Sequence, residues 1–242
     1  MNKMEISPTN YLSDPTEIEI KSREKRTMKK YIISLSTFML ISAFALYALA
    51  GCTEAENGKG ATEPKPTSIK IKGVEYSTEL TELYLNGMEL TDSDIEPLKH
   101  MTDLVLLVLG ENKINYIGAL SDLTKLTVLD LSDNPIKDID PLKNLTSLVR
   151  LGLNNNQIGD ISVLANLHNL TELGLGNNAI SDISALSGLT NLTSLFLQDN
   201  AINDISALSG LSNLTILSLT NNPVFEIVSE EEVRKMFPKL LN

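Results

Sequence analysis

The sequence predicts a solenoid, in which short repeated units of the chain stack on one another and share one core. Two observations support this prediction, because a leucine and an asparagine each return at a fixed interval of 22 residues. The leucines are Leu104, Leu126, Leu148, Leu170, Leu192 and Leu214, and the asparagines are Asn112, Asn134, Asn156, Asn178, Asn200 and Asn222. A fixed period of this length indicates a repeat architecture and not an ordinary globular core.

The pattern within one unit explains why the units must stack. In residues 124–145, Leu126, Leu129 and Leu131 alternate with open positions, which is typical of a short strand with one buried face. Further apolar residues follow at intervals of three, at Ile136, Ile139, Leu142 and Leu145. This spacing favours tight 3₁₀-like turns on the return path. A single unit cannot bury its own leucines, so neighbouring units must cover one another.

The repeated asparagine stands at the corner where each strand ends. Its amide both donates and accepts hydrogen bonds, so it can bond the backbone of its own coil and of the adjacent coil. A buried amide that loses such partners costs about 1–3 kcal/mol. We therefore expect these asparagines to form a structural ladder, and we expect the exposed neighbour of Asn156, Asn155, to contribute little.

The repeat resembles that of a known family. Its pattern, L-x-x-L-x-L-x-x-N-x-I-x-x-I-x-x-L-x-x-L, is similar to the 22-residue leucine-rich repeat of bacterial internalin-type proteins. The strings DIS-x-L at residues 182–186 and L-x-NLT-x-L at residues 189–195 add to the resemblance, which covers residues 68–242. It implies an α/β-class horseshoe with short parallel strands on the concave face and 3₁₀ or irregular turns on the convex face. It does not imply a particular ligand.

The N-terminal part has the pattern of an export signal. Residues 28–51 begin with Met-Lys-Lys and continue in an uncharged run, residues 31–50, which is typical of a secretory signal. The run leads into Leu-Ala-Gly-Cys, which resembles the bacterial lipobox and implies cleavage before Cys52 and lipid attachment to it. Cys52 is the only cysteine of the chain. The alternative is an uncleaved membrane helix with an incidental cysteine, because 20 uncharged residues can span a bilayer. Both interpretations predict an exported protein that is attached to the bacterial cell membrane and faces outward.

The position of this signal leaves residues 1–27 to be explained. A secretory signal normally starts at the N-terminus, whereas this one starts at residue 28. Either residues 1–27 extend the signal or the true start is Met28, which is the interpretation we favour. We therefore exclude this upstream extension from the fold.

A folded domain is expected over residues 68–242. Residues 52–67 are rich in Gly, Pro and charge and have no large apolar side chain, which indicates a flexible tether. The alternating segment from Ser68 to Tyr76 predicts a hairpin that caps the N-terminal end. Repeats run from about residue 80 to residue 222, and residues 223–242 have the helical spacing of a C-terminal cap.

Charge argues against a nucleic acid partner. The chain has a formal net charge of −11, and residues 1–51 hold seven Lys or Arg and five Asp or Glu, so the remainder carries −13. A strongly acidic domain repels the phosphate backbone of a nucleic acid.

The sequence contains no motif that indicates catalysis. The two histidines, His100 and His168, fall before expected strands, where a solvated loop histidine is the ordinary interpretation. Aspartates repeat every 22 residues, at Asp138, Asp160, Asp182 and Asp204. They could form a carboxylate ladder for cations, but Asp favours turns, and we expect each to bond the backbone of its own turn. We predict no catalytic residue, no cofactor, no bound metal and no small-molecule substrate.

The outward-facing strand positions predict a partner-binding surface. Its expected residues are Tyr84, Leu106, Val108, Val128, Asp130, Arg150, Glu172, Phe196 and Ile216. Apolar residues form two groups, one from Tyr84 to Val128 and one of Phe196 with Ile216, and glycines lie between them beside Arg150. Exposed apolar groups rimmed by charge often mark interfaces, although Val, Leu and Ile also simply suit strands.

Two classes of function follow from these features. The first is a lipid-anchored surface module that recognises a protein or a glycan on its concave face, and the internalin resemblance implies a protein partner. The second is a structural lipoprotein that organises the envelope by associating with itself through the apolar concave residues. An enzyme ranks behind both.

Overall fold

The computed structural model describes residues 65–226 and 229–241. The chain divides into two units after Gly60, and all described residues belong to the second unit, Ala61–Asn242. The expected upstream extension, the signal, Cys52 and nearly all of the tether lie outside the described residues.

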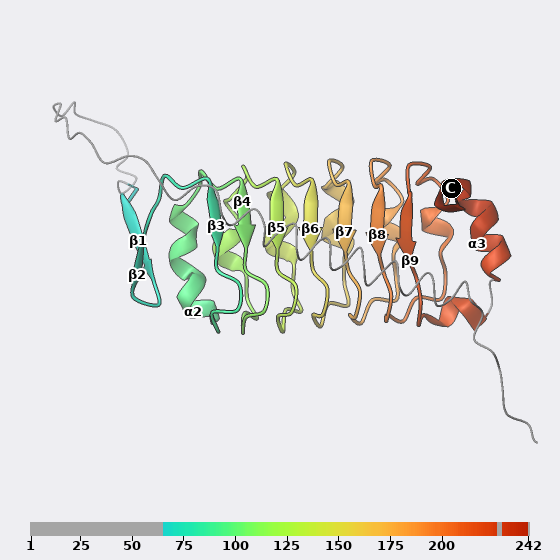
Figure 1. The fold of residues 1–242 in the computed structure, drawn as a ribbon, viewed down its shortest axis with the longest axis horizontal. Helices are drawn as coiled ribbons and strands as arrows, with labels where there is room; N and C mark the ends of the chain where they lie inside the picture. Colours follow the sequence, from blue (N-terminus) through green and yellow to red (C-terminus); the bar gives the residue numbers. More distant parts are fainter. Residues whose placement is uncertain (1–64, 227–228, 242) are drawn as a thin grey trace, which may run out of the picture. The chain divides into compact units, whose positions relative to one another are not determined.

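The second unit is built on a seven-stranded parallel sheet whose strands follow chain order (Figure 1). The strands are β3 (Glu82–Tyr84), β4 (Leu106–Val108), β5 (Val128–Asp130), β6 (Arg150–Gly152), β7 (Glu172–Gly174), β8 (Ser194–Phe196) and β9 (Ile216–Ser218). The register is constant, so that Leu107 pairs with Leu83 on one side and Leu129 on the other. From β4 onward a shift of 22 residues carries each strand onto the next, which confirms the predicted solenoid.

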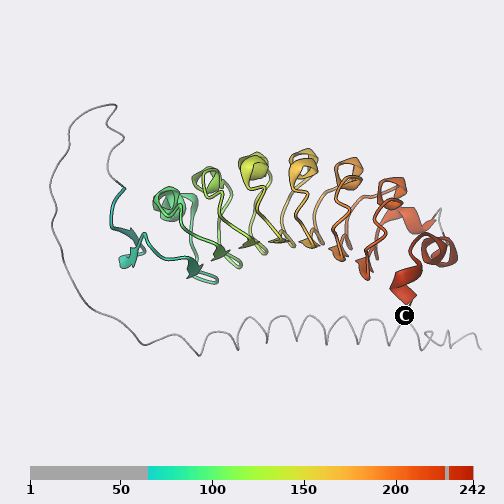
Figure 2. The ribbon, with the colours of Figure 1, turned by 90° about the horizontal axis from the view of Figure 1, so that it is seen from above.

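Short 3₁₀ helices form the return path of each coil. They are η2 (Glu96–His100), η3 (Gly118–Leu120), η4 (Asp140–Asn144), η5 (Ser162–Asn166), η6 (Ser184–Leu186) and η7 (Ser206–Leu208). Figure 2 shows the strands on the inner side of the curved row of coils and these helices on its outer side. The predicted 3₁₀ turns are therefore confirmed as well.

The periodic leucines and isoleucines fill one core between the sheet and the 3₁₀ layer. All seven apolar positions of the unit at residues 124–145 are at most 2% exposed. Each fully buried side chain of this type contributes about 1.5–3 kcal/mol. Because the chain has a single cysteine, no intramolecular disulfide supplements this core.

Each strand ends at a corner with a left-handed backbone. The corner residue has a φ between 53° and 59°, at Glu89, Glu111, Asp133, Asn155, Asn177, Asp199 and Asn221. Asn and Asp adopt this conformation more readily than other residues that carry a side chain. The expectation that Asn155 contributes little is therefore wrong, and its Nδ2 also donates to Asp133 Oδ1 at 2.8 Å.

The repeated asparagines bond two coils at once. Asn134 Nδ2 donates to the carbonyl of Leu131 in its own coil at 3.1 Å and to that of Leu109 in the preceding coil at 3.0 Å. Its Oδ1 accepts from the N–H of Ile114 in the preceding coil at 3.0 Å. The equivalent bonds recur at Asn112, Asn156, Asn178, Asn200 and Asn222.

A hairpin precedes the first repeat. It consists of β1 (Ser68–Ile71) and β2 (Val74–Ser77), which pair antiparallel. Lys72 and Gly73 both have positive φ, 49° and 81°, as a two-residue type I′ turn requires. Two isoleucines of β1 join the core, and the role of the hairpin as a cap stays a prediction.

The first repeat departs from the regular unit after its strand. A short helix, α2 (Asp92–Ile95), precedes η2, and the N–H of Thr91 donates to Asp94 Oδ2 at 2.9 Å at its start. His100 is the last residue of η2 and is half-buried, so its expected place in a loop is wrong.

Helical segments follow the last repeat. They are η8 (Pro223–Glu226), α3 (Glu230–Met236) and η9 (Pro238–Leu241). Phe237, between α3 and η9, is 3% exposed and belongs to the core, and the capping role of this region stays a prediction. Within residues 65–226 and 229–241, no helix is long and apolar enough to cross a membrane.

Candidate functional site

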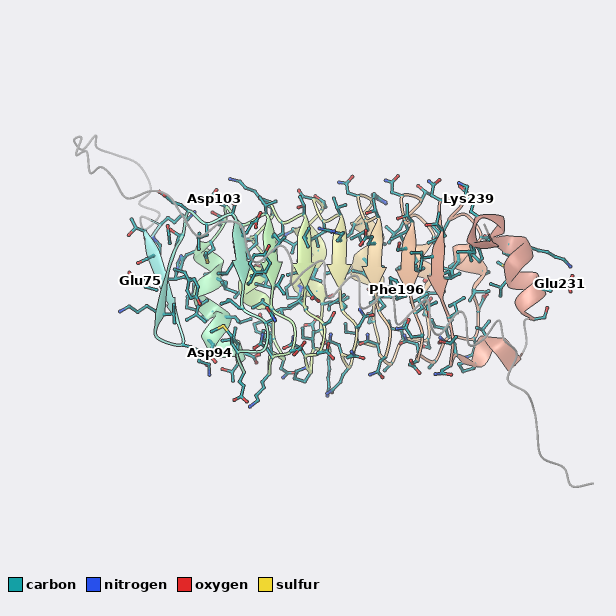
Figure 3. All side chains as sticks on the ribbon, viewed as in Figure 1. Glu75, Asp94, Asp103, Phe196, Glu231 and Lys239 are labelled. Atoms are coloured by element: carbon teal, nitrogen blue, oxygen red, sulfur yellow. The ribbon has the colours of Figure 1, made fainter. Side chains whose placement is uncertain are left out.

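The concave face presents its side chains as two rows, because alternate strand residues point away from the core. The first row is Glu82, Leu106, Val128, Arg150, Glu172, Ser194 and Ile216, and the second is Tyr84, Val108, Asp130, Gly152, Gly174, Phe196 and Ser218. Figure 3 shows Phe196 over the sheet, whereas Asp103 and Lys239 lie at the edge where the strands begin. Register thus brings all nine predicted contact residues onto one face.

The first apolar group lies over β3 to β5. Tyr84, Leu106 and Val128 are half-buried and remain open to a partner. Val108 is only 5% exposed, so the expectation that it contacts a partner is wrong. It lies in register between Tyr84 and Asp130, whose larger side chains stand on both sides of it.

Val105 extends this first apolar group and was missed by sequence reasoning. It precedes β4, is 37% exposed, and its N–H donates to the carbonyl of Thr81 at 2.7 Å. The signal was present, because the equivalent position in most other units holds threonine. An exposed valine at a position that usually carries a hydroxyl indicates an apolar rim.

The second apolar group lies over β8 and β9. Phe196 is half-buried and pairs with Gly174 on one side and Ser218 on the other, so small residues flank its ring. Ile216 is 41% exposed. An aromatic ring with free flanks offers a large contact area at a small cost in conformational entropy.

Polar side chains cover the glycines between the two groups. Asp130 lies over Gly152, Asn154 over Gly174 and Gln198 over Gly176, where a Cβ atom on the glycine would overlap the polar side chain. The N–H of Gly176 also donates to Asn154 Oδ1 at 2.9 Å. The floor expected beside Arg150 is therefore covered by polar groups, and sequence reasoning missed Asn154 and Gln198 because their partners lie 20 or 22 residues away.

Charged groups are unevenly engaged on this face. The hydroxyl of Tyr84 donates to Glu82 Oε2 at 3.2 Å, and burial, followed by the charge of Glu82, raises the pKa of Tyr84. Asp130 Oδ1 accepts from the N–H of Ser132 at 3.0 Å. The guanidinium of Arg150 is exposed and forms no hydrogen bond or ion pair with another described residue.

The other notable charges lie off the concave face. Asp103 forms ion pairs with Lys65 and Lys125, each at 2.6 Å, and these two ammonium groups lower the pKa of Asp103 to about 2. This contact attaches the start of the described chain to the edge of the sheet. Because all three side chains are exposed, the contribution to stability is small.

The repeated aspartates bond their own turns. Each accepts through Oδ1 from the N–H two residues later, in the pairs Asp138–Asp140, Asp160–Ser162, Asp182–Ser184 and Asp204–Ser206, at 2.8–2.9 Å. Such bonds stabilise the charged carboxylate, and the backbone N–H of Ser162 thereby lowers the pKa of Asp160. Among the described residues, no group of three or more His, Cys, Asp or Glu is arranged to hold a metal ion.

Family models match most of the repeat region. A model of leucine-rich repeats in two copies matches residues 124–166, 146–188 and 190–229, and a second leucine-rich repeat model matches residues 78–136. No curated protein matches the chain.

Solved structures of bacterial proteins are also similar to the chain. Internalin C2 from Listeria monocytogenes is 32% identical over 60% of this chain and 85% of its own, with a TM-score of 0.49. The leucine-rich repeat protein LIC12759 from Leptospira interrogans is 27% identical over 59% of this chain and 38% of its own, with a TM-score of 0.54. The chain therefore spans about two fifths of that Leptospira protein. With its stacked coils and with family models over residues 78–188 and 190–229, more than half of its length, the chain belongs to the leucine-rich repeat family.

Proposed function

We propose that this protein is a lipid-anchored module of the bacterial cell surface that recognises a protein on its concave face. Leucine-rich repeat domains generally act as protein-interaction modules and are typically not enzymes. The observation that supports a concave site is the pair of apolar groups, Tyr84 to Val128 with Val105, and Phe196 with Ile216, on a single rigid sheet. Exposed aromatic and aliphatic side chains of this kind are the usual anchors of protein interfaces.

The rigidity of the sheet favours binding. Backbone hydrogen bonds between neighbouring coils hold the strands in one register, as with Leu109 N to Asp130 O at 2.8 Å. Little backbone order must therefore be lost when a partner docks. The convex aspartates, in contrast, already bond their own turns.

The anchoring part of the proposal comes from the sequence before the described residues. The uncharged run at residues 31–50 and the Leu-Ala-Gly-Cys at residues 49–52 support export and attachment of lipid to Cys52. The following residues, 53–64, would hold the repeat domain away from the membrane as a flexible tether.

Concave and convex substitutions test the proposed site. A partner recovered by crosslinking to the anchored protein is titrated against Tyr84→Ala, Val128→Asp and Arg150→Ala, with Lys137→Ala on the convex side as the control. Each concave substitution should weaken binding by more than about 1 kcal/mol, while thermal stability changes little. Val128 is chosen instead of the buried Val108, where an aspartate would unfold the domain.

Two outcomes would contradict this proposal. Wild-type affinity in all three concave variants, with a loss in Lys137→Ala, would move the site to the outer face. Light scattering that shows association of the pure protein, abolished by Val128→Asp, would instead favour the envelope-organising role.

A further inference from the structure

The concave rows of the sheet carry one basic side chain, Arg150 on β6. Its guanidinium is exposed and is not paired with another described residue. Residues 151–226 contain no Lys or Arg at all, so Arg150 is the last base before the end of the repeats. An isolated base in a domain this acidic needs a physical explanation.

The structure shows why the nearest acid on the preceding strand does not pair with Arg150. Asp130 turns over Gly152 on β6, where the missing Cβ leaves room for its carboxylate. The backbone N–H of Ser132 then holds Asp130 Oδ1 at 3.0 Å. With Asp130 engaged in this way, the guanidinium of Arg150 keeps its donors for another molecule.

A free guanidinium recognises a specific chemistry. Its planar fork of N–H donors matches the two oxygens of a carboxylate, and such paired, charge-assisted bonds are about twice as strong as neutral ones. Arginine at the centre of an apolar surface is also among the commonest binding hot spots. Arg150 lies in register beside Val128, so an aliphatic surface adjoins the fork directly.

The spacing of the strands places this carboxylate relative to the apolar groups. Val128 is one strand from Arg150, about 5 Å away along the sheet, and Phe196 is two strands away on the other side, about 10 Å. An extended peptide rises about 3.3 Å per residue. A segment crossing the strands would therefore place its acidic residue next to one apolar residue and about three residues from another.

The surrounding charges limit the partner to a single acid at this point. Beyond Arg150 the first row continues with Glu172, and the rest of the repeats hold only acidic and neutral residues apart from His168. A second carboxylate over β7 to β9 would be repelled, whereas neutral or basic residues would be tolerated.

We propose that Arg150 anchors one carboxylate of a partner protein segment, whose flanking apolar side chains contact Val128 on one side and Phe196 on the other. This inference rests on the proposed protein-binding function and specifies the chemistry of its partner.

Selection from a random peptide library tests this inference. The full chain, purified in mild detergent, is used as bait in the wild-type form and as Arg150→Ala, Arg150→Glu and the convex control Lys137→Ala. Wild type and Lys137→Ala should enrich peptides with one Asp or Glu between apolar residues. Arg150→Glu should enrich Lys or Arg at that position, and thermal melting should show that all four proteins are folded alike.

A double substitution then measures the contact itself. Changing the enriched acid of one peptide to its amide should weaken binding to wild type by about tenfold or more. The same change should have no effect on binding to Arg150→Ala, because the fork is already absent. Equal losses in both proteins, or the same acidic enrichment with Arg150→Ala, would overturn the inference.

The experiment also separates this inference from the function on which it rests. If peptides lose affinity for Tyr84→Ala and Val128→Asp but show no preference for an acid, the concave site stands and the carboxylate anchor falls. If no concave substitution affects any peptide, the concave site falls as well.

Discussion

Substitution of Asn156 by alanine removes one rung of the asparagine ladder from the middle of the repeats. The wild-type amide accepts from the N–H of Ile136 at 3.1 Å and donates to the carbonyls of Leu131 and Leu153, each at 3.1 Å. Both carbonyls keep another partner after the substitution, because the amides of neighbouring asparagines also donate to them. The N–H of Ile136 is then the group left without a partner.

The cost follows from that single orphaned group. A buried donor that loses its acceptor costs about 1–3 kcal/mol, and because Asn156 is half-buried we expect about 2 kcal/mol. The end of the ladder should cost more. Asn112 is 8% exposed and serves the N–H groups of Met88 and Leu90 and the carbonyl of Leu85, so Asn112→Ala should lose a further ~1–3 kcal/mol.

Urea denaturation followed by circular dichroism measures these free energies of unfolding. The control is Gln157→Ala, because this exposed side chain forms no hydrogen bond with another described residue and the change should stay within about 0.5 kcal/mol. A loss at Gln157 equal to that at Asn156 would refute the reasoning, as would a smaller loss at Asn112 than at Asn156.

Three further predictions concern the anchor, one ion pair and one corner. Cells given labelled palmitate should label the wild-type protein but not Cys52→Ser, and label that persists in the variant would contradict lipidation. Asp103 should titrate by NMR with a pKa of about 2, and Lys125→Met should raise that pKa. Because this folded-state pKa lies below the ordinary 3.8, the stabilisation should be present above about pH 4 and lost as pH falls toward 2. Asn155→Gly should destabilise the domain less than Asn155→Ala, since glycine adopts its φ of 55° without strain, and the reverse order in thermal melting would contradict this reason.

The solenoid was predictable because its information is local and repeated. Within one unit, Leu126, Leu129 and Leu131 define the buried side of a strand, and the interval of 22 residues defines its neighbour in the sheet. The asparagine ladder followed for the same reason, since one amide at a fixed place in each coil meets the same backbone groups each time.

The candidate site was only partly predictable. Alternation indicates that Val108 and Arg150 both point away from the core, yet Val108 is covered and Arg150 is exposed. Val105 is open although it stands just before the strand. No periodic pattern distinguishes these residues, because their exposure depends on the particular side chains on the flanking strands.

The sequence by itself therefore determined the repeat, the register, the parallel sheet and the side of the sheet on which each residue stands. Only the tertiary structure decided which outward residues remain available and which are covered or already bonded. Asp130 is held by Ser132 over Gly152, and this leaves Arg150 unpaired. The physical reason is that side-chain direction is set by the local backbone, whereas exposure and pairing are set by contacts between coils 22 residues apart.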